Sequence, residues 1–462
     1  MAEPASFRYT VLLLIVWASS PLAAQGSRGA AVGGRVFGRD SGPIEQATVR
    51  IVNHSNGERW ETATNARGIY VIEYLSVGGP YRIEARAVGY RPAARDSILL
   101  ALGQRLTLDF DLVPAALELE EVTVVAEVDR LEGARTGPTR IVTDSTIARL
   151  PISGRGYPEL ALLSPQVTIS PNGGLSFAGT HDRLNSIQVD GASNTDLFGS
   201  AASGAGTPGW AVGLNSFSPE AVKEIQVVSA PFDVRYGGFA GGLINAVTKS
   251  GSNRVEGSVH GYVEGSDLSG GDEEIVGSYA NDELGITLGA PVVRNRLALF
   301  VDASVRRQVT PQAFPAPSAE TDGEEVGIPY DSLVRFQEAL RSYGVEPGSF
   351  SAGAVSAPTR NVFGKITLQL GVNSRLELSH DYGHGTLEDA TGPRFPDQYA
   401  LSSFGSRTPE TINATRLAWT AGLGRVTNEL LLARVDDRRR CEANADFSQV
   451  HVMIDQGEML AG

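Results

Sequence analysis

The residue patterns that most often carry enzyme chemistry are absent from this sequence. It contains no H-E-x-x-H zinc motif, no G-x-S-x-G nucleophile motif and no Walker A loop. The stretch GAGTPG at residues 204–209 matches G-x-G-x-x-G, but no strand precedes it and Pro208 disfavours the helix that must follow. We therefore expect a loop there, and we predict that the protein is not an enzyme and uses no cofactor.

Two features of the sequence could attract a cation. His380 and His384 are spaced to share one face of a strand or a helix, yet no third ligand accompanies them. The acidic residues within 267–274 form a run of a kind that is usually solvated surface. No metal site is predicted.

The size and composition of the chain exclude several classes of protein. Its 462 residues are enough for two or three domains, and its net charge of -14 comes without a cluster of Lys and Arg that could hold phosphates. Nucleic acid is therefore not an expected partner. The single cysteine, Cys441, rules out an intrachain disulfide, so packing must supply stability.

The N-terminus has the pattern of a secretory signal. Arg8 precedes an apolar run from Val11 to Ala18, and small residues follow through Ala24. A membrane-spanning helix needs about 20 apolar residues, and this run is much shorter. We predict a signal peptide over residues 1–25. An exported chain without later apolar helices is either soluble beyond the inner membrane or an outer-membrane barrel.

Residues 30–114 carry short alternating runs separated by turn residues, which is typical of a β-sandwich of roughly seven strands. In RLTLDFDLVP (105–114), the residues Leu106, Leu108, Phe110 and Leu112 share one face, as in a half-buried antiparallel strand. The segments GRVFGRDSGPIEQATVRI and TNARGIYVIEYLSVGGPYRIEARAVGY resemble the carboxypeptidase-regulatory-like domain. That resemblance implies a transthyretin- or Ig-like sandwich that serves in folding or docking and carries no catalysis.

The stretch ALELEEVTVVAEVDR (116–130) follows the sandwich. Val122, Val124 and Val125 make a short β-prone run between acidic residues, followed by Gly and Pro. Such a run outside a domain is available to pair with the sheet edge of another protein. A simple spacer is the alternative.

Residues 139–252 show mixed periodicity that predicts a compact α+β domain. Asp144 is expected to cap a short helix, and GRGYPELALLSP is expected to form another with Leu160, Leu162 and Leu163 on it. LNSIQVDG predicts a strand that enters an Asp-Gly turn, and SPEAVKEIQVV predicts a capped helical turn that runs into a strand.

Beyond residue 255 the sequence changes to long two-residue alternation. RLALFVDASVRR (296–307) has an uncharged apolar face, and residues 364–383 and 414–435 predict hairpins of the same kind. Residues 310–359 suit a long loop with one helix inside it. Long alternating strands joined by short turns and long loops are typical of an outer-membrane barrel, although a soluble sandwich stays possible.

A glycine-framed strand, GGLINAVTKSGSN (241–253), joins these two regions. The longer stretch VRYGGFAGGLINAVTKSGSNRVEGSV resembles the end of the plug domain of TonB-dependent receptors, GTHDRLNSIQVDGASN resembles its other common motif, and GRGYPELALLSP is similar to Oar-like members. We expect the paired glycines to permit close approach where the plug meets the barrel wall. The plug-motif residues are Asp190, Gly191, Arg235, Tyr236, Gly237, Gly241, Gly242, Asn245, Thr248, Lys249 and Gly251.

The resemblance implies a domain order and a mechanism. It implies a plug at 136–253, a partial barrel at 255–462 and a TonB-box-like strand at 118–127, best matched by EEVTVVA. The box candidates are Glu121, Val122, Thr123, Val124, Val125 and Ala126. Periplasmic TonB, acting with ExbB and ExbD, would energise uptake of a siderophore, an oligosaccharide or a peptide.

Two questions stay open at this stage. A non-transporting adhesion or assembly protein of the outer membrane, which binds through its sandwich and loops, is the alternative function. Plugged importers have about 22 barrel strands, whereas the residues after 255 supply roughly eight. We therefore expect a fragment or a truncated reading frame.

Overall fold

The structure is a computed structural model, and strands dominate it, as predicted. The described residues are 28–39, 41–115, 139–150, 156–170, 174–195, 208–209, 212–214, 217–229, 237, 239–269, 279–311, 319, 328–350, 354–390, 393–395, 398–423, 426–454 and 457–461. The predicted signal peptide and the predicted TonB-box strand lie outside these residues. Within them, no helix has the length and hydropathy needed to cross a bilayer.

The N-terminal sandwich consists of two sheets that enclose one apolar core. One sheet is built on β1 (Ala30–Gly38), which pairs with β2 (Gly42–Pro43), β5 (Ile69–Leu75), β8 (Arg105–Thr107) and β9 (Phe110–Leu112). The other has the order β4-β3-β6-β7, formed by Arg59–Ala63, Thr48–Asn53, Gly78–Arg86 and Ala93–Leu100. Alternate residues point inward, and the core includes Val32, Val36, Ile51, Trp60, Tyr81, Ile83 and Phe110. The predicted sandwich is confirmed.

The last strand of the sandwich differs from the prediction. Leu106, Phe110 and Leu112 are buried, so the predicted face is right, but the run is split into β8 and β9, and both pair parallel to β1. At the break, the hydroxyl of Tyr70, which lies 38 residues earlier in the chain, donates to the Leu108 carbonyl at 2.7 Å. The parallel direction is not visible in the alternation, which is the same for both kinds of pairing.

The central domain, residues 139–253, is built around a mixed sheet. Its strand order is β10-β15-β16-β13-β14. These strands are Thr139–Thr143, Val222–Val228, Leu243–Thr248, Ser186–Val189 and Ala192–Ser193. The glycine-framed strand is β16, which pairs antiparallel with β15 and parallel with β13, and every one of its residues is buried. A second, small sheet pairs β11 (Val167–Ile169) with β12 (Leu175–Phe177).

Short helical turns close the ends of these strands. They are α2 (Asp144–Ile147), α3 (Tyr157–Ala161), η1 (Asp182–Leu184) and η3 (Pro219–Ala221). Ser218 is the N-cap of η3, as predicted, whereas Thr143 takes the N-cap of α2 and Asp144 becomes its first residue. Helix α3 contains Leu160 but ends at Ala161, one residue before Leu162.

The predicted Asp-Gly turn joins β13 to β14. Asp190 and Gly191 have φ values of 49° and 79°, and Val189 pairs with Ala192. Two consecutive residues with positive φ define the tight type I′ hairpin turn, which favours Gly in the second position. This turn places the Asp190 side chain against β16.

The paired glycines before β16 make their close approach inside the central domain. A Cβ on Gly242 would overlap the ring of Phe177, and one on Gly241 would collide with the side chain of Asn185. The expectation of contact with the barrel wall is therefore wrong for this pair. Gly251 lies close to the long sheet, because a Cβ there would collide with the backbone of Leu299.

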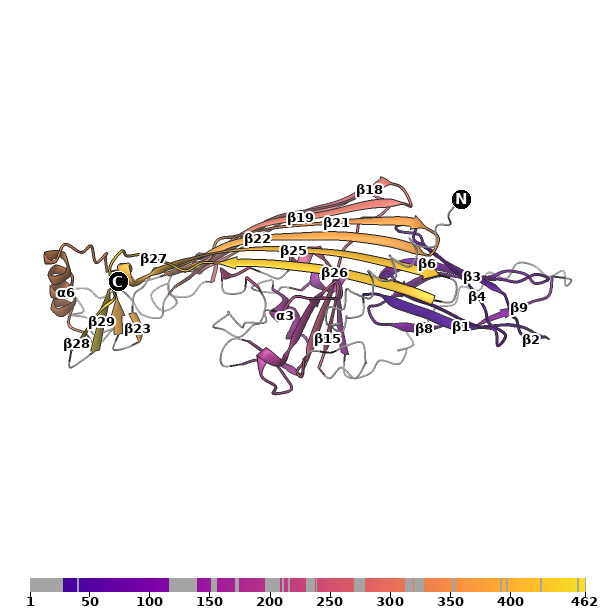
Figure 1. The fold of residues 1–462 in the computed structure, drawn as a ribbon, viewed down its shortest axis with the longest axis horizontal. Helices are drawn as coiled ribbons and strands as arrows, with labels where there is room; N and C mark the ends of the chain where they lie inside the picture. Colours follow the sequence, from indigo (N-terminus) through magenta and orange to yellow (C-terminus); the bar gives the residue numbers. More distant parts are fainter. Residues whose placement is uncertain are drawn as a thin grey trace, which may run out of the picture.

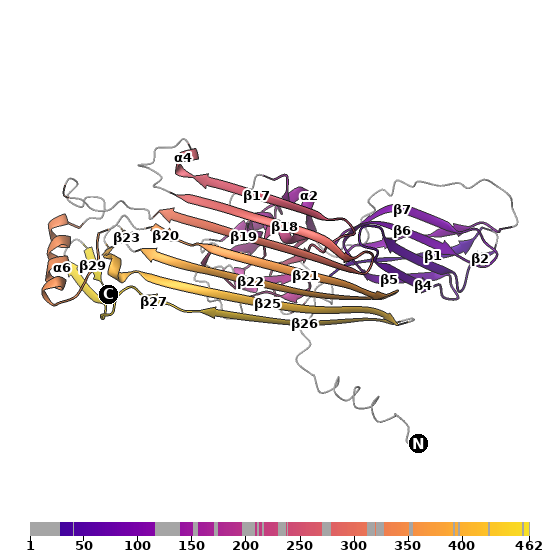
Figure 2. The ribbon, with the colours of Figure 1, turned by 90° about the horizontal axis from the view of Figure 1, so that it is seen from above.

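The long sheet, residues 256–443, curves over the central domain (Figures 1 and 2). Its strands run in the order β17-β18-β19-β20-β22-β25-β26, with β21 between β19 and β22 and β27 beside β25. The bounds along the edge-to-edge path are Glu256–Gly265 for β17, Ala280–Val293 for β18, Leu297–Pro311 for β19, Ala354–Ser356 for β20, Ser374–Ala390 for β22, Ser406–Leu423 for β25 and Val426–Arg439 for β26. Strand β21 is Thr359–Gly371 and β27 is Glu442–Ala443. Each pair in it is antiparallel, as predicted.

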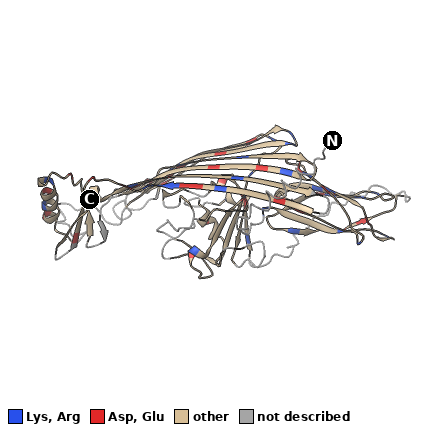
Figure 3. Ribbon diagram, in the orientation of Figure 1, with Lys and Arg blue, Asp and Glu red and all other residues tan. Residues whose placement is uncertain are grey.

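The two faces of the long sheet differ in character. Rows of apolar side chains cross the outer face; in one of them Leu299, Ile366, Leu378, Leu417 and Leu432 pair in register from strand to strand. Ile366 is 43% exposed and Leu432 is 55% exposed. Along the whole sheet, charged residues occupy only scattered positions (Figure 3).

The inner face carries buried charges toward the central domain. The buried residues of this face include Asp302, Lys365, Arg375, Glu377, Asp381 and Arg416. The long sheet is thus apolar where it is exposed and charged where it is covered, which inverts the pattern of a soluble sandwich.

A small distal unit lies at the end of the long sheet away from the sandwich (Figure 2). It pairs β23 (Pro393–Phe395), β24 (Gln398–Ala400), β29 (Gly457–Ala461) and β28 (Val450–Ile454), with α4 (Ser266–Ser269) and η5 (Ser402–Phe404) as short turns elsewhere in this half. Helix α6 (Tyr330–Ser342) is the helix predicted inside residues 310–359, and it packs on β24 and β29 through Leu333, Phe336, Tyr399 and Met459.

The contact at Gly242 gives a test of the central packing. Gly242→Ala should lower the stability of the central domain by about 1–3 kcal/mol, because the new methyl group must displace the Phe177 ring in a filled core. The thermal midpoint of the purified chain measures it. Gly364→Ala is the matched control, because a Cβ there meets nothing within 4 Å. Equal midpoints for the two variants would contradict this account.

Candidate functional site

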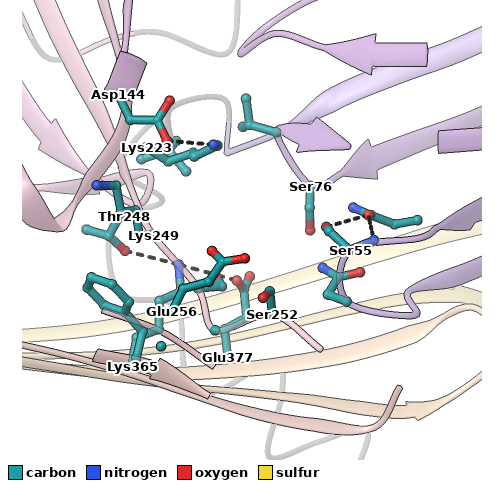
Figure 4. A pocket seen from close by; sticks show the side chains of 18 of the residues that line it. Ser55, Ser76, Asp144, Lys223, Thr248, Lys249, Ser252, Glu256, Lys365 and Glu377 are labelled. Carbon is teal, nitrogen blue, oxygen red and sulfur yellow. Dashed lines mark hydrogen bonds and ion pairs between the residues drawn. The ribbon is translucent and has the colours of Figure 1, made fainter. Parts of the chain in front are cut away.

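The sandwich, the central domain and the long sheet meet around one cavity. Its volume is about 470 Å³, and its lining includes Ser76 of the sandwich, Asp144 and Lys223 of the central domain, and Lys365 and Glu377 of the long sheet (Figure 4). Lys223 Nζ and Asp144 Oδ2 form an ion pair of 2.7 Å at its wall. The lining is mostly polar and contains charges of both signs.

Lys365 connects the long sheet to the central domain. It lies on β21 at an inward position, between the outward Gly364 and Ile366, and is 4% exposed. Its Nζ lies 3.1 Å from Thr248 Oγ1, 3.5 Å from Asp190 Oδ2 and 3.4 Å from Glu377 Oε1. The buried ammonium group of Lys365 thus contacts two carboxylates, Asp190 of the central domain and Glu377 of the long sheet.

Asp190 is held in place by β16 before it meets Lys365. Thr248 donates to it twice, from its backbone N–H at 2.9 Å and from its hydroxyl at 2.7 Å. Burial raises the pKa of Asp190, but Lys365 and the two Thr248 hydrogen bonds outweigh burial and lower that pKa below its ordinary value. Asp190 is therefore a carboxylate that Thr248 holds in position to pair with a cation of the long sheet.

Glu377 joins the same ion network to the sandwich. On β22 it lies 2.5 Å from Arg28 Nη2 of the N-terminal segment, and Arg28 also reaches Glu429 at 3.2 Å. Arg375, two residues earlier on the same face, pairs with Glu58 of the sandwich. Arg375 and Glu58 are 3% and 2% exposed in their side chains.

Further hydrogen bonds fix Glu58 and Arg375. Trp60 Nε1 donates to Glu58 Oε1 at 2.7 Å, and Arg375 donates to the Ser76 hydroxyl at 2.5 Å and to the Tyr74 carbonyl at 3.2 Å. The sandwich also contacts the central domain, because Leu102 N–H donates to Glu224 Oε2 at 2.6 Å. The three parts are therefore fastened to one another by buried polar contacts.

The structure brings together two of the predicted plug-motif residues, Asp190 and Thr248. Asn245 lies on β16 in register with Gln188 and Gln226 on the neighbouring strands. The backbone N–H of Lys249 donates to the Ala221 carbonyl at 2.7 Å. Burial lowers the pKa of the Lys249 ammonium group, against the opposing effect of Asp144.

The other predicted residues lie apart from this network or outside the described residues. Gly237 is described, whereas Arg235, Tyr236 and the box residues Glu121, Val122, Thr123, Val124, Val125 and Ala126 are not. His380 and His384 each share a hydrogen bond with a threonine of β25, at 2.8 Å and 2.9 Å.

The sequence-based prediction missed the charges that hold the parts together. These are Arg28, Glu58, Lys365, Arg375, Glu377 and Glu429. The charged residues of the long sheet could have been recognised from the sequence, because a charged side chain on the inner face of a strand whose outer face is apolar needs a partner inside the protein. The sequence does not show which residue, hundreds of positions away, is the partner of each charge.

Comparison with known proteins agrees with this organisation. Residues 31–113 match the family model of the carboxypeptidase regulatory-like domain. The N-terminal sandwich is a carboxypeptidase regulatory-like domain. The chain is also 29% identical, over 255 residues, to the TonB-dependent transporter Oar of Myxococcus xanthus. That alignment covers 51% of this chain and 23% of Oar, so the chain matches about a quarter of the length of this relative.

Two solved structures are similar to the chain at low sequence identity. The outer membrane transporter YddB of Escherichia coli has a TM-score of 0.46 and 13% identity, over 64% of this chain and 38% of YddB. The ferric enterobactin receptor PfeA of Pseudomonas aeruginosa has a TM-score of 0.47 and 14% identity, over 66% of this chain and 42% of PfeA. The predicted resemblance to Oar is confirmed, and the named proteins are transporters and a receptor.

Replacing Lys365 tests the attachment of the central domain. Lys365→Met should reduce the free energy of unfolding by about 3–5 kcal/mol, because it leaves the carboxylate of Asp190 buried without its cation and removes one of the cations around Glu377. Combined with Asp190→Asn, the loss should be smaller than the sum of the two single losses, as measured by denaturant unfolding.

The control is an exposed pair. Arg50 and Glu61 are 51% and 37% exposed, so Arg50→Ala should cost at most about 1 kcal/mol. Losses that add within about 0.5 kcal/mol for Lys365→Met and Asp190→Asn would show that the two residues do not interact.

Asp190 also predicts a pH dependence. Because its folded pKa is lowered from 3.8, its contribution is present above pH 3.8 and is lost as the pH falls through the lowered value. The difference in thermal midpoint between the wild type and Asp190→Asn should be constant near neutral pH and shrink only below pH 3.8. A difference that already shrinks at about pH 6 would mean that another group is responsible.

Proposed function

We propose that this protein is a TonB-dependent outer-membrane receptor in which the central domain is the plug and the long sheet is part of the barrel wall. The observation that carries the proposal is the inverted polarity of the long sheet. Its outer face exposes apolar rows such as Ile366 and Leu378, and its inner face buries charges such as Lys365. Lipid outside and a polar domain inside satisfy both faces, whereas water outside would leave the apolar rows of the outer face exposed.

The relatives and the order of the parts support the same proposal. Oar is named a TonB-dependent transporter, and it is similar to this chain over 255 residues. The proposed domains are a signal peptide at 1–25, the sandwich at 30–114, the TonB-box strand at 118–127, the plug at 136–253 and barrel strands at 255–462. The proposed location is the outer membrane, with the sandwich on the periplasmic side.

The proposed mechanism follows from the contacts of the plug. Periplasmic TonB, energised with ExbB and ExbD, adds the 120–126 strand to its own sheet and pulls on the chain that leads into β10. Opening a path requires the plug to separate from the wall, and the Asp190–Lys365 contact then breaks. The ligand is of the siderophore, oligosaccharide or peptide class, and the loops and plug apices select it.

TonB binding tests the box directly. Val124→Pro should abolish binding of purified periplasmic TonB domain to the protein in outer-membrane vesicles, because proline removes a donor from the added strand. Ala134→Pro, downstream of the box, is the matched control and should bind as the wild type does. Co-sedimentation of TonB with the vesicles measures binding.

Two outcomes would contradict the proposal. Equal TonB binding by Val124→Pro and the wild type would reject the box assignment. Absence of TonB binding by the wild-type protein in the outer membrane would favour a non-transporting adhesion or assembly protein.

A further inference from the structure

A second contact between the plug and the wall has the composition of a metal site. Glu220 of η3, His260 of β17 and Glu283 of β18 each offer one ligand atom, and these atoms lie within 4.8 Å of one another. The Nε2 atom of His260 lies 3.8 Å from Glu220 Oε2 and 3.8 Å from Glu283 Oε1. Among the described residues this is the one such cluster.

The three side chains are held by different elements and are largely buried. They are 13%, 10% and 8% exposed for Glu220, His260 and Glu283 respectively. His260 lies opposite Gly285 in the antiparallel register, and a Cβ on Gly285 would collide with the imidazole. The missing side chain lets the ring lie across β18 toward Glu283, its diagonal neighbour.

Glu220 is fixed from the side of the plug. Pro219 precedes it as the first residue of η3, and the carbonyl of Ala221, the next residue, accepts the hydrogen bond from Lys249. Lys249 is the first residue of the link that leads from β16 into the first long strand, β17. The cluster therefore lies beside the covalent connection between the plug and the wall.

The cluster contains two carboxylates, Glu220 and Glu283. Asp302 on the next strand also repels Glu283, whereas Arg306 attracts it and donates from Nε to Asn281 at 2.8 Å. Carboxylates taken out of water need compensating charge, and a bound cation supplies it.

We propose that Glu220, His260 and Glu283 bind a divalent transition-metal ion, with Zn²⁺ as the best fit. One imidazole nitrogen and two carboxylate oxygens are donors that Zn²⁺ accepts, with a remaining position for water. Ligands at about 2.0–2.1 Å from a tetrahedral ion lie about 3.3 Å apart, so each 3.8 Å pair closes by roughly 0.5 Å. The ion fastens the plug to the first two strands of the wall.

Zinc titration of the whole 462-residue chain in detergent, after removal of metal with a chelator, tests the site. We expect one Zn²⁺ bound per chain in calorimetry and a higher thermal midpoint of the plug, because the ion binds the seated plug. X-ray absorption should show one nitrogen and two oxygen ligands from the protein.

Variants separate this site from adventitious binding. Glu220→Gln, His260→Gln and Glu283→Gln should each weaken Zn²⁺ binding at least about tenfold, as expected when a metal loses one of its few ligands. His451→Gln is the control, because His451 pairs with Glu458 in the distal unit and should bind as the wild type does. Glu220→Gln alters only the plug and leaves the barrel strands unchanged. The heat-dependent migration of the protein in gel electrophoresis, which reports on the barrel strands, shows whether each variant is folded.

Three results would overturn the proposal. The first is no Zn²⁺ binding by the folded wild type, and the second is equal affinity in all the ligand variants. The third is that the stability of the protein rises as the pH falls through the range in which histidine titrates, and does not change when Zn²⁺ is added. In that case a protonated His260, not a metal, balances the two carboxylates.

Discussion

A buried ammonium group at Lys365 sets the arrangement of the whole molecule. An uncompensated charge inside a protein costs several kcal/mol, so Lys365 requires carboxylates at short range, and it finds Glu377 on its own sheet and Asp190 on the central domain. The partner on the sheet, Glu377, then needs further cations, which Arg28 and Arg375 supply. Each pairing involves a further part of the chain, so that the sandwich, the central domain and the long sheet are linked by one network of charges.

The same constraint explains why the long sheet has two unlike faces. Its outer rows present apolar Leu and Ile to the surroundings. Its inner face holds charges that the polar side chains of the central domain and the sandwich satisfy. Ion pairs of this kind give strong attachment while they are buried, and water can replace them where the parts separate.

The local residue pattern predicted many of the strands and turns, because these elements are determined by residues that are close together in the sequence. Alternation fixed the long strands and their faces, Asp190–Gly191 identified the turn after β13, and Ser218 identified the start of η3. The split of β8 from β9 and their parallel pairing involve contacts with β1 and with the hydroxyl of Tyr70, which are far away in the sequence. The charge network likewise joins Glu58 to Arg375, and no spacing rule relates residues so distant. Long-range pairing was therefore the part that sequence could not supply.

The tip of one long hairpin covers the edge of the sandwich. Asn373, in the turn between β21 and β22, bonds the backbone of Glu61 at 2.6 Å and 2.9 Å, and its own N–H bonds the Arg59 carbonyl at 3.1 Å. Strand β4 is the outermost strand of its sheet. A sandwich that moved away from the long sheet would expose unsatisfied backbone groups there, and such groups bind any extended segment within reach. The tip of the hairpin therefore protects this edge strand from pairing with other extended chains.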